Sequence, residues 1–225
     1  MLRLMRREFG YRRAAMLVVL ASVAWGVTGC DEDEWVAVVL AVNPFYTQQD
    51  VSSDADLAGA WLYADVVNKD GESENGGNES VRFTFTPAEN NSYTVIVDEM
   101  DGSKHFSSRF EGHLFRLGGQ SFLDLYPTSV PEGSEFYFMH FFRCHTVTRI
   151  DFRGGRLEMT FLNGSWLAGQ IKSGAVSIAH TKADDMLLLT ATTQEIQEVL
   201  FLNATDENAF AETLLFDRAA AEEGR

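Results

Sequence analysis

The run Val81-Arg82-Phe83-Thr84-Phe85-Thr86 decides the fold class, because large apolar residues alternate strictly with polar ones along it. Successive side chains of a β-strand point to opposite faces, so this two-residue period predicts a strand with one face in a core and the other in water. The same period recurs in 93–98, 104–116 and 156–161. The chain is therefore predicted to be mainly β.

Turn signals separate these runs and set the connectivity. They are Asp101-Gly102, Gly118-Gly119, Pro131-Glu132-Gly133 and Gly154-Gly155. Short strands joined by such turns predict an antiparallel meander that forms a barrel or a sandwich. Residues 68–79 are polar and glycine-rich, and predict a loop with nothing to bury.

Two apolar segments are harder to place. Residues 136–142 are densely aromatic and predict a strand that is buried on both faces. Residues 35–42 are apolar but far too few to cross a membrane, so they form either an added strand or a segment packed on the domain. Cys144, next to the aromatic run, is expected to be a small buried hydrophobe.

The C-terminal third predicts short helices. Asn163-Gly164-Ser165 can begin one helix. Thr192 and Glu195 have the spacing of a capping box and predict a second helix, with Ile196 and Leu200 on one face. We also expect a strand over 186–191, a helical turn over 205–212 and an extended segment over 213–216.

The entry to the first clear strand resembles that of the calycin barrels, which include the lipocalins. The shared feature is Gly59-x-Trp61. The resemblance implies a calycin-like barrel in which Trp61 packs across one end and Gly59 permits a tight approach. It also implies a basic residue stacked on the tryptophan, for which Arg218 is the candidate. The second lipocalin motif, a Thr-Asp-Tyr turn, is missing.

The N-terminal sequence predicts an export signal. Arginines precede an apolar run over 14–25, which is followed by small residues and then by Val27-Thr28-Gly29-Cys30. These four residues resemble the lipobox of bacterial lipoproteins, and much of the mature chain resembles uncharacterised members of that group. The resemblance implies cleavage before Cys30, lipid on its thiol, and a domain held outside the cytoplasm on a membrane of the cell envelope.

Three alternatives remain open for this segment: an ordinary signal peptide with an incidental cysteine, an uncleaved anchor, and a twin-arginine signal at Arg6-Arg7. Asp31 favours retention at the inner membrane in some bacteria, but the choice between the two membranes stays open.

These signals divide the chain into four parts. Residues 1–29 are the predicted signal peptide, 30–56 the lipidated cysteine with a tether and approach segment, 57–218 a single β-rich domain, and 219–225 a flexible tail. The net charge is −15 for the whole chain and about −19 without residues 1–29. Such a field repels nucleic acid and anionic lipid head groups, so no nucleic-acid partner is expected.

No motif for a known chemistry is found in the sequence. It contains neither the Gly-x-Ser-x-Gly elbow of common hydrolases nor a phosphate-binding loop. His140 and Cys144 would share a strand face and could ligate a soft metal, but the usual zinc spacings are absent. We therefore assign no catalytic residues, metal or cofactor.

Two function classes remain. The first is a binding or interaction module for a small apolar ligand or an envelope protein, suggested by the anchor and the aromatic strands. The second is an envelope hydrolase with an unrecognised site. An enclosed apolar cavity would favour ligand binding. A barrel interior filled by side chains would leave a partner-protein or structural role. Clustered polar groups with shifted pKa values in a concave site would favour the enzyme, and scattered histidines with no acid or nucleophile beside them would argue against it.

Overall fold

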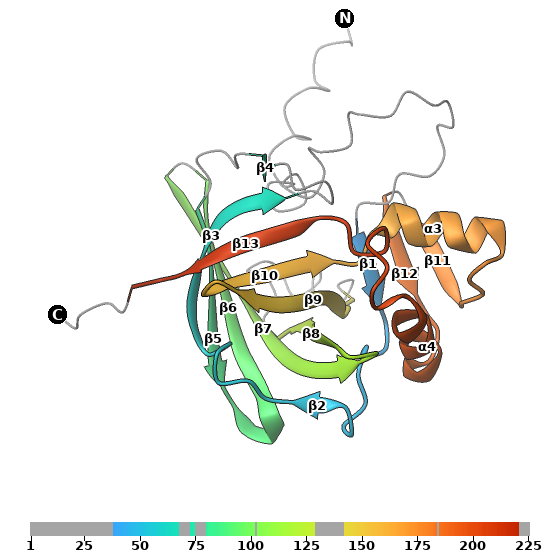
Figure 1. Cartoon of the computed structure of the whole chain (residues 1–225), viewed down its shortest axis with the longest axis horizontal. Helices are drawn as coiled ribbons and strands as arrows, with labels where there is room; N and C mark the ends of the chain where they lie inside the picture. The colour runs from blue at the N-terminus through green and yellow to red at the C-terminus, as the bar shows by residue number, and fades with distance from the viewer. Residues whose placement is uncertain are drawn as a thin grey trace, which may run out of the picture.

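The computed structural model describes residues 38–67, 73–74, 80–101, 103–128, 142–183 and 185–220. Its main feature is a closed antiparallel barrel of eight strands (Figure 1). Neighbouring strands follow one another along the chain, and the last strand pairs with the first. The strands are β3 (Gly59–Val67), β5 (Ser80–Pro87), β6 (Ser92–Asp101), β7 (Lys104–Leu117), β8 (Gln120–Pro127), β9 (Thr146–Arg153), β10 (Arg156–Phe161) and β13 (Thr213–Arg218).

The prediction of a mainly β fold built from an antiparallel meander is confirmed, and so is closure into a barrel. The alternating run in β5 points Phe83 and Phe85 inward, where both are buried. In the ladder they lie opposite Val97 and Val95 of β6, which are buried as well. Cross-strand apolar pairs of this kind stabilise a sheet and fix its register.

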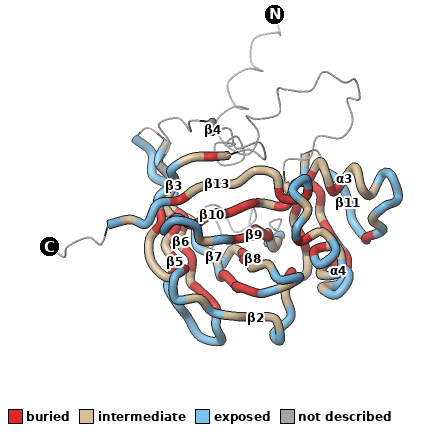
Figure 2. Tube along the Cα trace, in the orientation of Figure 1, coloured by how far each residue is buried: buried red, intermediate tan, exposed pale blue. Residues whose placement is uncertain are grey.

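Side chains fill the barrel around the Trp61 end. Trp61, Phe83, Phe85, Phe216, Leu157 and Met159 are all less than 2 % exposed or at that limit. Phe83 contacts Phe216 edge-on, with ring centroids 5.3 Å apart. Figure 2 shows the buried stretches running along the barrel strands. This interior is one of two separate apolar cores.

A second layer covers one side of the barrel, and all of it except one N-terminal strand lies between β10 and β13 in the sequence (Figure 1). It has a small sheet in the order β1-β12-β11, in which β1 runs parallel to β12. Among the described residues it also holds two α-helices. The elements are β1 (Val38–Ala41), α3 (Gly164–Ser173), β11 (His180–Ala183), β12 (Met186–Leu189) and α4 (Thr193–Asn203).

The second core lies between this layer and the outer wall of the barrel. Phe115, Phe122 and Val147 point outward from β7, β8 and β9 and are buried there. The layer contributes Phe45, Leu187, Leu189, Ile196 and Leu200 to the same cluster. Strands β8 and β9 are therefore buried on both faces, which explains why their sequences lack a simple alternation.

Both predicted helix starts are confirmed. The Asn163 side chain accepts a hydrogen bond from the backbone N–H of Trp166. At α4, Thr192 and Glu195 form the complete capping box. Residues 205–212, by contrast, form turns and not a helix, because the Asp206 carboxylate accepts the N–H of Asn208 and so favours a local turn.

Smaller elements refine the prediction. The 35–42 segment supplies the added strand β1, and Phe45 is fully buried. β2 (Val51–Ser52) pairs with β7, and β4 (Ser73–Glu74) pairs with β3 inside the expected 68–79 loop. A short 3-10 turn, η1 (Glu89–Asn91), links β5 to β6. Cys144 is half-buried and not fully buried as expected.

Several predictions lie outside the described residues. They concern the signal peptide with Cys30, the aromatic run up to Phe141, most of the 68–79 loop and the end of the tail. In the described part of the chain, no helix is both long and apolar enough to cross a lipid bilayer.

Candidate functional site

Two polar features stand out against the apolar cores, and the first closes one end of the barrel. The Trp61 ring lies inside, and its indole N–H donates to the Leu57 carbonyl at 3.0 Å. The Arg218 guanidinium carbon lies 4.3 Å from the centroid of that ring. Arg218 also donates to the carbonyls of Asp56 and Ala58, at 2.6 and 3.0 Å. The stack expected from the calycin resemblance is thus present.

Gly59 allows this arrangement. Its φ of +124° lies in a region that side chains with a Cβ rarely adopt, and a Cβ there would lie 3.0 Å from the Arg218 guanidinium. A glycine is therefore needed for the backbone to pass Arg218 this closely. Arg218, the last residue of β13, thereby holds the segment that leads into β3, the first strand of the barrel.

A shallow hollow of about 470 Å³ lies outside this end. Arg82 and Arg218 line it together with Gly59, Ala60, Thr84 and the last described residues of the chain. Both terminal nitrogens of Arg218 already bind backbone carbonyls. We therefore interpret Arg218 here as a structural residue.

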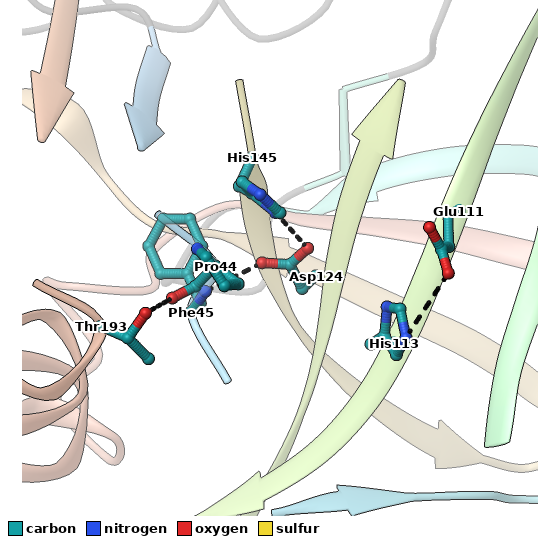
Figure 3. Close-up of polar contacts among 7 residues, drawn as sticks. All are labelled: Pro44, Phe45, Glu111, His113, Asp124, His145 and Thr193. Atoms are coloured by element: carbon teal, nitrogen blue, oxygen red, sulfur yellow. Dashed lines mark hydrogen bonds and ion pairs between the residues drawn. The ribbon is translucent and has the colours of Figure 1, made fainter. Parts of the chain in front are cut away.

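The second feature is a buried carboxylate on the outer wall of the barrel. Asp124 of β8 points away from the interior and is 0 % exposed. One of its oxygens accepts the backbone N–H of Phe45 at 3.0 Å, and the other lies 2.8 Å from Nδ1 of His145 (Figure 3). A buried carboxylate is costly unless it is paired and hydrogen-bonded, and here both oxygens have partners.

Aromatic rings surround the pair. The His145 ring lies 4.5 Å from the Tyr126 ring, and Arg143 lies over the same Tyr126 at 5.6 Å. The side chain of His145 retains 12 % exposure. Its backbone also forms two hydrogen bonds with Ala41 of β1, so His145 is held from both sides.

A second histidine lies one strand away in the same wall. His113 of β7 stacks on Tyr46 with ring centroids 4.3 Å apart, and its Nε2 is 3.7 Å from a Glu111 oxygen. Burial lowers the pKa of His113, although Glu111 and Asp124 oppose the shift. Burial also raises the pKa of Tyr46 to about 12, and the charges of Asp124 and Glu111 add to that shift. Both rings are therefore neutral at pH 7.

This cluster joins the second layer to the barrel. The segment that carries Phe45 and Tyr46 is held to Asp124 on one side, and the Pro44 carbonyl accepts the hydroxyl of Thr193 at 2.8 Å on the other (Figure 3). Asn43 adds a hydrogen bond to the Ala191 carbonyl. The polar contacts thus connect β8, the segment after β1 and the start of α4.

The chemistry open to the cluster is proton transfer. A histidine whose Nδ1 binds a buried carboxylate is held in one tautomer, which leaves Nε2 to take or give a proton. The nearby Cys144 does not complete a nucleophile pair, because its sulfur lies 3.9 Å from the Phe142 carbonyl and burial raises the pKa of its thiol.

The sequence-predicted residues are distributed as follows. Gly59 and Trp61 meet at the barrel end, whereas Cys30 and His140 lie outside the described residues. Among the described residues, no cluster of three or more histidine, cysteine, aspartate or glutamate side chains could hold a metal ion. His105 and His180 are exposed at the surface.

Sequence reasoning did not find the pairing of Asp124 with His145. The one available signal was a lone acid inside the apolar run Phe122–Leu125, which is an unusual place for a charge. In a comparison with protein-family models, curated proteins and solved structures, the chain has no significant match to any of them.

Proposed function

We propose that this chain is a bacterial envelope lipoprotein, anchored through acyl chains on Cys30, whose barrel domain binds a partner protein through its outer surface. The anchor is supported by the order of basic, apolar and small residues before Cys30. Stable anchoring requires more than one acyl chain, which a lipidated N-terminal cysteine of this type would carry.

The observation that carries the proposal is the filled barrel around Trp61. Trp61, Phe83 and Phe216 occupy the space that a ligand would need in this half of the barrel. Gly112 points into the same interior, and a Cβ there would lie only 2.9 Å from a Val95 methyl carbon. Tight packing at Gly112 and around Trp61 favours contacts made outside the barrel.

The outer surface supports a protein partner. Phe201 and Leu202 near the end of α4 are 56 % and 72 % exposed, although both are large and apolar. Glu198, one turn earlier on the same face of the helix, is also exposed. With a net charge of −15 on the chain, the complementary surface would combine apolar and basic residues.

We also infer that the barrel is of the calycin type. Eight strands in chain order, a tryptophan across one end and an arginine from the last strand stacked on it support this inference. The layer of 162–212 between β10 and β13 is an addition to a plain barrel.

The anchor is tested by the intact mass of protein extracted from bacterial membranes. We expect a chain that begins at Cys30 and carries the mass of acyl groups, and expect Cys30→Ser to leave the protein unprocessed or released from the membrane. A mature chain with an unmodified Cys30 would contradict the proposal.

The outer surface is tested by a photo-crosslinking amino acid at Leu202, with Thr86 on the exposed face of β5 as the matched control. We expect one identified envelope protein to crosslink at Leu202 only, and Phe201→Ser to abolish the product. High salt should reduce the yield of the crosslinked product. A stoichiometric small apolar molecule in native mass spectrometry, without a protein product, would favour ligand carriage instead.

One observation favours the hydrolase as the second candidate. The carboxylate of Asp124 orients His145 at 2.8 Å, as required of a general base. Hydrolysis of a panel of nitrophenyl esters by the purified protein, and its loss in His145→Asn, would support an enzyme. His105→Asn is the control, because His105 also lies 3.0 Å from a carboxylate but at the exposed surface.

A further inference from the structure

The second layer differs in charge from the rest of the chain. The sequence has 33 acidic and 18 basic residues, yet no acid occurs between Glu158 and Asp184. This acid-free segment includes α3 and β11. Lys172 at the end of α3 and Lys182 in β11 are both exposed. His180 on β11 is exposed as well.

The anchor point is close to this surface. Seven residues separate Cys30 from Val38, where β1 begins. Eight residue steps reach at most about 28 Å when fully extended. The start of β1 must therefore lie within that distance of the lipid-bearing cysteine.

Strand register then places Lys182 two strands from β1, on the far side of β12. Val39 pairs with Leu187 of β12, and Leu187 pairs with Lys182 of β11. Neighbouring strands are about 4.8 Å apart, so Lys182 lies roughly 10 Å from β1 across the small sheet. In Figure 1, β1, β11 and α3 lie on one side of the molecule and the tip of the β6–β7 hairpin lies on the other.

We propose that the surface formed by α3, the 174–179 connection and β11 faces the membrane and contacts anionic lipid head groups through Lys172 and Lys182. This inference rests on the proposed anchor at Cys30. Two observations support it. Only seven residues separate Cys30 from β1, and this surface carries lysines and no acid within its segment although the chain as a whole is acidic. Two acids, Asp184 and Asp185, follow β11 in the sequence, and Asp185 is half-buried.

The orientation also predicts which part of the barrel lies far from the bilayer. With the α3–β11 surface against the membrane, the β6–β7 hairpin is held away from it. Met100 and Phe106 of this hairpin are 39 % and 51 % exposed.

The test uses the mature chain coupled chemically through Cys30 to a maleimide lipid, in a Cys144→Ser background, so that it does not depend on acylation by the cell. A dye is carried by an unnatural amino acid at Ser177, in the exposed 174–179 connection, or at Ser107 in the hairpin as the matched control. Vesicles contain phosphatidylcholine with or without phosphatidylglycerol, and a head-group spin label quenches dyes near the bilayer.

We expect quenching at Ser177 to exceed that at Ser107 several-fold, and to increase with phosphatidylglycerol. The double variant Lys172→Glu/Lys182→Glu should remove that increase, whereas Lys104→Glu/Arg153→Glu, with two exposed charges elsewhere, should retain it. Equal quenching at the two sites would overturn the orientation. Quenching at Ser177 that is indifferent to lipid charge would overturn the head-group contact.

The two proposals fail separately. An unmodified Cys30 in protein from the native membrane would contradict the anchor. The quenching pattern on chemically coupled protein decides the orientation of the domain on its own.

Discussion

The barrel and the second layer are built in different ways from one chain. Every barrel strand pairs with its neighbour in chain order, except where β13 closes on β3. The small sheet instead brings β1 from one end of the domain alongside β12, and the Asn43–Ala191 hydrogen bond spans 148 residues. The barrel is thus largely a product of local hairpins, whereas the layer exists only once the whole chain has folded.

The largest effect is expected from a substitution at the end of the barrel that Trp61 closes. Trp61→Ala deletes a side chain that is 1 % exposed and leaves Arg218 without its stack. We expect the free energy of unfolding to fall by about 3–5 kcal/mol, measured by urea denaturation. Leu62→Ala, at a 37 % exposed neighbour, is the control and should cost far less. A small loss in Trp61→Ala would show that the end is loosely packed.

The next effect concerns the contact between the two regions. Asp124→Ala leaves the Phe45 N–H and His145 without their buried partner, which should cost about 3 kcal/mol. Hydrogen exchange should accelerate in β1 and in 42–47 more than in β5 and β6. Asp151→Ala, at an exposed carboxylate, is the control. Uniform acceleration throughout the chain would mean that barrel and layer unfold as one unit.

Packing inside the barrel is tested by adding a single methyl group. Gly112→Ala should destabilise by about 2 kcal/mol, because the new carbon would lie 2.9 Å from a Val95 methyl. Gly169→Ala, in α3 with nothing within 4 Å, should instead stabilise by up to about 1 kcal/mol. If Gly112→Ala were neutral, the interior would have spare room, and ligand carriage would regain support.

The smallest effect is a pH dependence on the outer wall. Burial lowers the pKa of His113 below its ordinary value of 6.5, so below about pH 6.5 the unfolded chain binds more protons than the folded chain. The free energy of unfolding should therefore decrease as pH falls from 7.5 to 5.5. His113→Phe, which retains a ring beside Tyr46, should reduce that decrease, measured by urea midpoints. His105→Gln is the control and should leave the slope unchanged.

Prediction succeeded where the signal was local. Alternation in 81–86 and the cap residues Asn163 and Thr192 act within a few neighbours, so they predicted β5, α3 and α4 correctly. The helical turn predicted over 205–212 is wrong, because the Asp206 side chain favours a non-helical turn. Strands β8 and β9 have core on both faces, which removes the two-residue period that marks a strand.

A resemblance to calycin barrels singled out Gly59 and Trp61. The sequence by itself determined the fold class and the helix starts. These depend on backbone geometry and on the period of side chains along a strand, and both are properties of short segments. Only the tertiary structure decided that Asp124 meets His145 and Phe45, and that β1 joins β12. Those contacts link distant segments, and they form because burying the outer wall of the barrel requires a second apolar surface from both ends of the domain.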